Sequence, residues 1–97
     1  MNLFQYELPL EDERFDTLFE KGDVQIVRIV SAHVKTPKTF CDKKEEWVVL
    51  LKGRALLELD GIIELQAGES LYIPANKEHR LLEVEPGTLW LAFHFKS

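Results

Sequence analysis

The chain has little of what marks several large classes of protein. Its 97 residues contain one cysteine, Cys41, so no disulfide can form within the chain and the fold does not depend on an oxidising compartment. The longest apolar runs, 47–51 and 89–93, are far shorter than the ~20 residues that a membrane-spanning helix needs. No basic cluster is longer than Lys43-Lys44, which argues against a nucleic-acid partner.

The charge and composition describe an ordinary globular domain. Acidic residues outnumber basic ones 17 to 12, which gives a net charge of −5, and 45% of the residues are hydrophobic. The first basic side chain is Arg14, so the N-terminus lacks the charged start of a secretory signal. A chain of this length holds one core. We therefore expect a cytoplasmic single-domain protein with no nucleic-acid and no membrane partner.

The apolar pattern separates a short N-terminal segment, 1–22, from a strand-rich barrel region, 23–97. Helical spacing links three apolar residues of the first segment, Phe15, Leu18 and Phe19. Gly22 suits the end of a helix, so a short helix is predicted over 11–20. Because so short a helix is marginal alone, we expect it to pack on the barrel.

Short strands separated by turn residues are predicted for the rest of the chain. We expect about seven of them, over 24–30, 47–51, 55–59, 62–65, 70–73, 78–83 and 88–95. A polar loop is expected over 35–44, and Asp60-Gly61 is a strong hairpin signal. The connections are too short for the crossovers of a parallel sheet, so the sheet should be largely antiparallel. A sandwich or barrel follows, and an SH3-like or OB barrel fits the same strand count.

Two spaced groups of residues stand out in this region. Six positions separate Glu46 from Gly53, and five separate Gly68 from Pro74, with His79 five residues further on. This pattern resembles the two motifs of the cupin superfamily. The resemblance covers most of the chain and implies an all-β, antiparallel double-stranded β-helix, the jelly-roll barrel, here with a short N-terminal helix.

The resemblance also implies a metal site. In the family, where a metal is present, two histidines and the glutamate of the first motif bind it together with the histidine of the second. Glu46 and His79 match, whereas Asp42 and Cys41 stand four and five residues before Glu46 in place of histidines. Glu46 and His79, with Asp42 or Cys41 as third ligand, are thus the candidate site for a divalent cation such as Zn, Mn, Fe or Ni.

Strand alternation supports a buried position for the glutamate. Glu46 shares a face with Val48 and Leu50, which points it into the barrel, while Trp47 faces away, against the predicted helix. A buried carboxylate is costly unless it is paired, hydrogen-bonded or metal-bound. The alternatives are a solvated Glu46 at the start of its strand and a His79 hydrogen-bonded at the barrel mouth without metal.

Four other residues are candidate ligand contacts: His94, Trp90, Tyr72 and Arg28. In the last strand, Trp90 and His94 share one face and a more apolar set shares the other, so simple alternation puts His94 on the less buried side. Whether that side lines the cavity stays open. Tyr72 and Arg28 are either donors to an anionic ligand inside the barrel or exposed at its rim.

Two functions from different classes fit these observations. One is a small cupin that binds a divalent metal and a small polar ligand, with Glu46 or His79 positioned to move a proton. The other is a metal-free, non-enzymatic module that binds a ligand or forms a dimer, and the fold alone does not choose between them. A homodimer is expected in either case, because small cupins commonly associate and an open barrel leaves strand edges to be covered.

Overall fold

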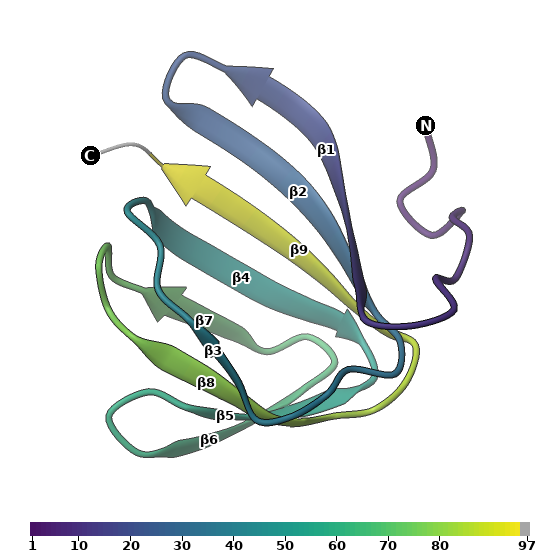
Figure 1. Cartoon of the computed structure of the whole chain (residues 1–97). Coiled ribbons are helices and arrows are strands. Elements are labelled where there is room, and N and C mark those ends of the chain that lie inside the picture. The colour runs from purple at the N-terminus through teal and green to yellow at the C-terminus, as the bar shows by residue number, and fades with distance from the viewer. Residues whose placement is uncertain (96–97) are drawn as a thin grey trace.

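Nine strands and no helix make up residues 1–95, the part of the chain that this computed structural model describes. They form two antiparallel sheets that face each other (Figure 1). The larger sheet has the order β1 (Glu13–Lys21), β2 (Val24–Ser31), β9 (Thr88–Phe95), β4 (Glu45–Lys52) and β7 (Ser70–Ile73). The smaller has the order β3 (Lys38–Phe40), β8 (His79–Val84), β5 (Arg54–Glu58) and β6 (Ile62–Gln66).

The chain passes repeatedly from one sheet to the other. Every connection from β2 to β9 changes sheets except the β5–β6 hairpin, which turns at the predicted Asp60-Gly61. This winding is that of a jelly-roll barrel, and it confirms the predicted all-β antiparallel fold. Within the described residues there is also no helix that is long and apolar enough to cross a membrane.

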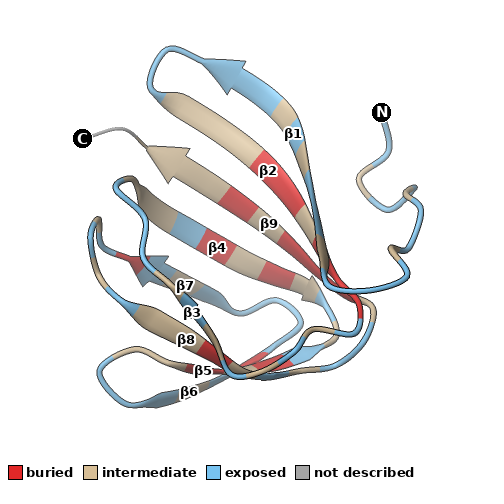
Figure 2. Ribbon diagram, viewed as in Figure 1, coloured by how far each residue is buried: buried red, intermediate tan, exposed pale blue. Residues whose placement is uncertain are grey.

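The core fills the space between the two sheets. Alternate residues of each strand point inward and pack there. The buried apolar cluster consists of Val48, Leu50, Ala55, Leu57, Leu65, Ile73, Leu81, Trp90 and Ala92. Figure 2 shows buried bands across the middle of β2, β9 and β4, with exposed tips at the turns.

The predicted N-terminal helix is wrong, since this segment is the edge strand β1. It pairs with β2 and has a bulge between Thr17 and Phe19. The extra residue resets the alternation, so that Phe15 lies on the inner face and Phe19 on the outer face. A strand with one bulge therefore presents the same apolar spacing as a helix, and Gly22 lies in the β1–β2 turn.

Two smaller expectations also need correction. The predicted loop over 35–44 contains the three-residue strand β3, paired with β8. Trp47 does face away from the core, but it packs on Phe93 of β9, with ring centroids 5.4 Å apart, and not on a helix.

Candidate functional site

A cavity of about 350 Å³ opens between the two sheets. This volume lies in the range of small-molecule sites. Eight apolar residues form most of its wall: Phe15, Ile29, Phe40, Val48, Leu57, Ile73, Leu81 and Trp90. Five polar residues complete it: Glu13, Asp42, Glu46, His79 and His94. The barrel interior is thus a largely apolar pocket with a small number of polar groups.

A hydrogen-bonded pair, Glu46 and His94, forms the main polar feature of the pocket. The two residues are direct partners across β4 and β9, and Nε2 of His94 contacts Oε2 of Glu46. Their side chains are 21% and 14% exposed, respectively. Pairing offsets the desolvation of the carboxylate. A carboxylate and an imidazole placed together can bind a hydroxyl or amine and can transfer a proton.

His79 is a second imidazole on the pocket wall, at the start of β8. Its Nδ1 lies 3.1 Å from the carbonyl oxygen of Lys77, which can only accept, so Nδ1 donates this hydrogen bond and Nε2 is the acceptor nitrogen in the neutral form of the ring. The ring stacks on Phe40, with centroids 5.6 Å apart. Asp42, two residues after Phe40, also lines the pocket, and its Oδ1 accepts a hydrogen bond from the backbone N–H of Lys44.

The expected metal ligands share this pocket without forming a metal centre. Among residues 1–95, no three carboxylate, imidazole or thiol side chains are close enough together to hold one ion. Glu46, His79 and Asp42 all line the cavity, but Glu46 is paired with His94. Cys41 is exposed and is not among the described lining residues. The residues as arranged do not fit the family's metal centre, and metal binding stays a prediction.

Glu13 is a polar wall residue that the sequence did not point to. Its carboxylate is 6% exposed and accepts a hydrogen bond from the hydroxyl of Ser31 at 2.7 Å. Ser31 in turn accepts one from the indole N–H of Trp90 at 3.0 Å. The alternation of residues along β1 is the feature that points Glu13 inward. The helix predicted for this segment does not have that alternation.

Lys38 connects Glu13 to the surface. Its ammonium lies 3.5 Å from the Glu13 carboxylate and 3.0 Å from that of Asp12. Partial burial lowers the pKa of Lys38, but the hydrogen bond to Asp12 and the charge of Glu13 outweigh this, so the pKa lies above its usual value. This ion pair joins β3 and β1, which are each at one edge of their sheet.

His94 and Trp90 lie on the buried face of β9, contrary to simple alternation. Trp90 and Ala92 are 5% and 0% exposed, and His94 continues the same face into the pocket. Alternation was misleading because the outer face of this strand is also apolar, with Leu91 and Phe93 only half-buried.

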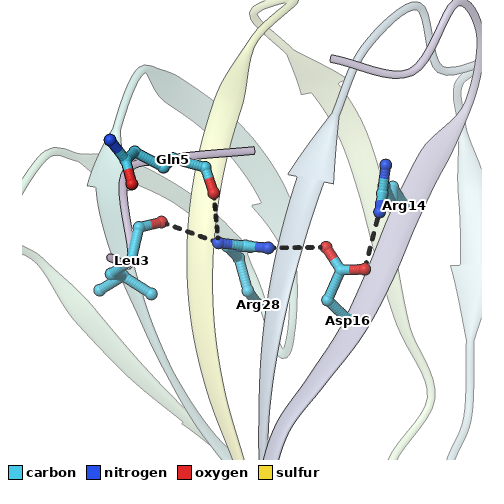
Figure 3. Close-up of polar contacts among 5 residues, drawn as sticks. All are labelled: Leu3, Gln5, Arg14, Asp16 and Arg28. Carbon is cyan, nitrogen blue, oxygen red and sulfur yellow. Dashed lines mark hydrogen bonds and ion pairs between the residues drawn. The ribbon is translucent and has the colours of Figure 1, made fainter. Parts of the chain in front are cut away.

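Arg28 and Tyr72 do not reach the pocket wall. Tyr72 is exposed on the outer face and donates a hydrogen bond to Glu45 at 2.7 Å. Arg28 is buried on the same outer face, beneath the N-terminal segment (Figure 3). Neither is placed to contact a ligand in the barrel.

The Arg28 guanidinium holds the N-terminal segment on the sheet. It donates to the carbonyl oxygens of Leu3 and Gln5 at 3.2 and 3.1 Å and to the carboxylate of Asp16 at 3.1 Å (Figure 3). Burial raises the pKa of Asp16, but hydrogen bonds from Arg14 and Arg28 outweigh this, so the pKa lies below its usual value. The contacts of this cluster hold the N-terminal segment and β1 against β2.

Comparison with known families identifies the class of protein. The family model for the cupin domain matches residues 25–93, which include the Glu46, His79 and Trp90 positions of the pocket. The chain therefore belongs to the cupin family. A search of the curated proteins found no match.

Solved structures agree with this assignment. A candidate mannose-6-phosphate isomerase from Ralstonia eutropha JMP134 is 29% identical, with a TM-score of 0.85, and the alignment covers 100% of this chain and 97% of the other. KdgF from Halomonas sp. is 15% identical, with a TM-score of 0.81 and coverage of 100% and 93%. A cupin superfamily protein from Desulfitobacterium hafniense DCB-2 is 19% identical, with a TM-score of 0.76 and coverage of 95% and 84%. The last two show the shared fold.

Proposed function

We propose that this cupin binds a small molecule in the barrel, with an apolar body against the walls and one hydrogen-bonding group at the Glu46–His94 pair. The single observation that supports this most strongly is the pocket itself: about 350 Å³, mainly apolar, with that partly buried pair on its wall. Such sites use apolar area for affinity and a few placed polar groups for orientation. Ligand binding without a metal is sufficient to explain the arrangement, and no step of the proposal requires a metal.

The charges on the wall favour a neutral or cationic ligand. The described lining residues include three carboxylates, Glu13, Asp42 and Glu46, but no lysine or arginine. A phosphate group is normally held by cationic side chains or helix N-termini. The sugar phosphate in the name of the Ralstonia protein is therefore a poor fit to this wall, and an amine or alcohol is a better one.

Three probes with the same body and different heads test this directly: benzylamine, benzyl alcohol and benzoate. Binding is measured by isothermal titration, with mannose 6-phosphate as a fourth compound. Because small fragments gain at most about 1.5 kcal/mol per heavy atom and usually far less, affinities on the order of millimolar are expected. We expect benzylamine and benzyl alcohol to bind and benzoate and mannose 6-phosphate to bind at least tenfold more weakly.

The chain offers a matched control for the site. Glu46→Gln removes the inward carboxylate charge and should reduce the preference for benzylamine over benzyl alcohol. Glu45→Gln removes the charge of the adjacent residue, which lies on the outer face and accepts a hydrogen bond from Tyr72. This variant should leave the preference for benzylamine unchanged. Equal effects of the two variants, or tightest binding by benzoate, would contradict the proposal.

A divalent metal held by Glu46 and His79 is the second candidate. The observation that favours it is the Lys77 carbonyl on Nδ1 of His79, which leaves Nε2 as the available donor atom, as second-shell partners do in metal sites. Elemental analysis of untagged protein, purified without chelator, tests it against a His79→Ala variant. Stoichiometric metal that is lost in the variant would establish this candidate, and metal-free protein after incubation with Zn, Mn, Fe and Ni would exclude it.

A further inference from the structure

The pocket contains a second well-buried carboxylate, which the proposed function does not use. Glu13 lines the same cavity as Glu46 and His94, and its side chain is 6% exposed. Glu13 lies on β1 and Glu46 on β4, and β2 and β9 lie between these strands in the larger sheet (Figure 1). The cavity therefore has a polar position on the edge strand as well as the one at the Glu46–His94 pair.

The strand register places these two polar positions far apart along the barrel. Glu13 is the cross-strand partner of Ser31, and Ser31 is that of Thr88 on β9. Glu46 is the partner of His94, which is six residues further along β9 than Thr88. At about 3.3 Å per residue, the two positions are offset by roughly 20 Å along the strands. A ligand that contacts both must be elongated.

Apolar side chains separate the two polar positions. On the larger sheet, the lining residues in the rows between them are Phe15, Ile29, Trp90 and Val48. These side chains offer no acceptor to a polar group, since the indole N–H of Trp90 is a donor and is already bound to Ser31. A ligand that spans the cavity should therefore have an apolar middle, with its polar groups at the ends.

The Glu13 carboxylate is held in place and can still accept a hydrogen bond. Ser31 donates to its Oε2 at 2.7 Å, and the Lys38 ammonium lies 3.5 Å from its Oε1. An ionised carboxylate has about four acceptor positions, so these two contacts do not saturate it. Lys38 is closer to Asp12, at 3.0 Å, and is not among the described lining residues of the cavity. Glu13 is thus suited to a ligand group that donates a hydrogen bond.

We propose that Glu13 is a second anchor for the ligand, so that the pocket takes a linear molecule with a hydrogen-bond donor, such as an amine, at each end. This inference rests on the proposed function, because it keeps one donor group of the ligand at the Glu46–His94 pair. Two carboxylates at the ends disfavour an anionic group at either one. Length then determines specificity, since only a molecule that matches the separation of the two positions makes both contacts.

Isothermal titration with two series of probes tests the second anchor. One series is the 1-aminoalkanes from butane to decane, and the other is the α,ω-diaminoalkanes of the same lengths. The 1-aminoalkanes should bind more tightly with each added methylene, because the wall is mainly apolar. The diamines should exceed the matching amine by at least about tenfold at one length, the effect of one hydrogen bond to a charged group. Shorter diamines should show no such excess, because they do not reach Glu13.

Two carboxylates that contact Lys38 supply a variant and its matched control. Glu13→Leu should abolish the excess of the best diamine and leave the affinities of the 1-aminoalkanes within about twofold. Asp12→Asn removes the other Lys38 partner, which is not among the described lining residues, and should keep the excess. Circular dichroism checks folding. If Glu13→Leu does not fold, Glu13→Gln replaces it, and loss of the charge should reduce the excess at least about threefold.

The outcomes separate this inference from the proposed function. A constant ratio of diamine to amine affinity along the series would overturn the second anchor. An excess that survives in the Glu13 variant, or that disappears in Asp12→Asn, would also overturn it. In each of these cases the 1-aminoalkanes still bind, so the proposed function stands. No binding by any probe would overturn the proposed function and this inference with it.

Discussion

The turn between β4 and β5 leaves little space around Gly53. Its φ is +98°, and a Cβ added there would lie 2.4 Å from Oγ1 of Thr88. Thr88 is fully buried and donates a hydrogen bond to the carbonyl oxygen of Glu85 at 2.6 Å. Its hydroxyl also accepts one from the backbone N–H of Arg54 at 3.3 Å. Glycine is therefore needed here for its backbone conformation and for space.

Comparison with Gly68 separates these two effects. Gly68 has a similar φ of +93°, but no neighbouring atom of residues 1–95 lies within 4 Å of its added Cβ. Gly68→Ala should lower the free energy of unfolding by about 1–2 kcal/mol through backbone strain alone. Gly53→Ala adds the clash with Thr88 and should cost roughly 1–3 kcal/mol more. Urea unfolding of both variants measures the difference, and equal losses would show that the Thr88 contact does not limit this turn.

At the residue scale, local motifs could be predicted and long-range partners could not. Glu46 and His79 follow from their spacing to glycine and proline, and both line the pocket. The Glu46 partner, His94, is 48 positions further along the chain and becomes its neighbour only through the β4–β9 register. Nothing local specifies that register. Glu13 was missed for a similar reason, since its inward direction depends on the pairing of β1.

At the scale of elements, β1 shows how one extra residue can disguise a strand. Phe15 faces the pocket and Phe19 lies on the outer face of the larger sheet, and the bulge between them supplies the shift. A period-2 pattern that slips once produces apolar spacings of three and four, which are those of a helix. β3 could not be predicted because its three residues are too few to show any period. It pairs with one neighbour, β8.

The N-terminal segment is an element that a charged side chain helps to hold on the sheet. Arg28 binds two of its carbonyl oxygens and is itself held by Asp16. The folded-state pKa of Asp16 lies below the ordinary value of 3.8. The ionised carboxylate therefore stabilises the fold above pH 3.8, and this stabilisation is lost as the pH falls through the lower folded-state pKa.

Asp16→Asn tests this attachment. At neutral pH the variant should be less stable than the wild type by about 0.5–1 kcal/mol, a value typical of a partly exposed ion pair. The gap should close as the pH falls below 3.8. Urea midpoints of the two proteins across this range measure it, with Asp23→Asn in the exposed β1–β2 turn as control. A gap that widens in acid would contradict the assigned role.

At the scale of the whole molecule, the sequence predicted the architecture better than the path of the chain. Antiparallel strands, the Asp60-Gly61 hairpin and the cupin motifs together were enough for the jelly-roll barrel. The alternation between sheets needed the structure, because the turns that cross between sheets resemble turns within one. The larger sheet therefore has two different faces, with Glu46 inside against the pocket and Trp47 exposed on the outside.

The central claim is that a ligand enters the barrel, and the two tryptophans of the chain allow a direct test. Trp90 lines the pocket and Trp47 lies on the outer face, so Trp47→Phe leaves a single reporter inside the barrel. Trp90→Phe leaves a single reporter outside it. Each variant is titrated with benzyl alcohol while its tryptophan emission is recorded. We predict a saturable change in Trp90 emission and no saturable change in that of Trp47. A response from Trp47 alone, or from neither, would contradict the assignment of the pocket as the binding site.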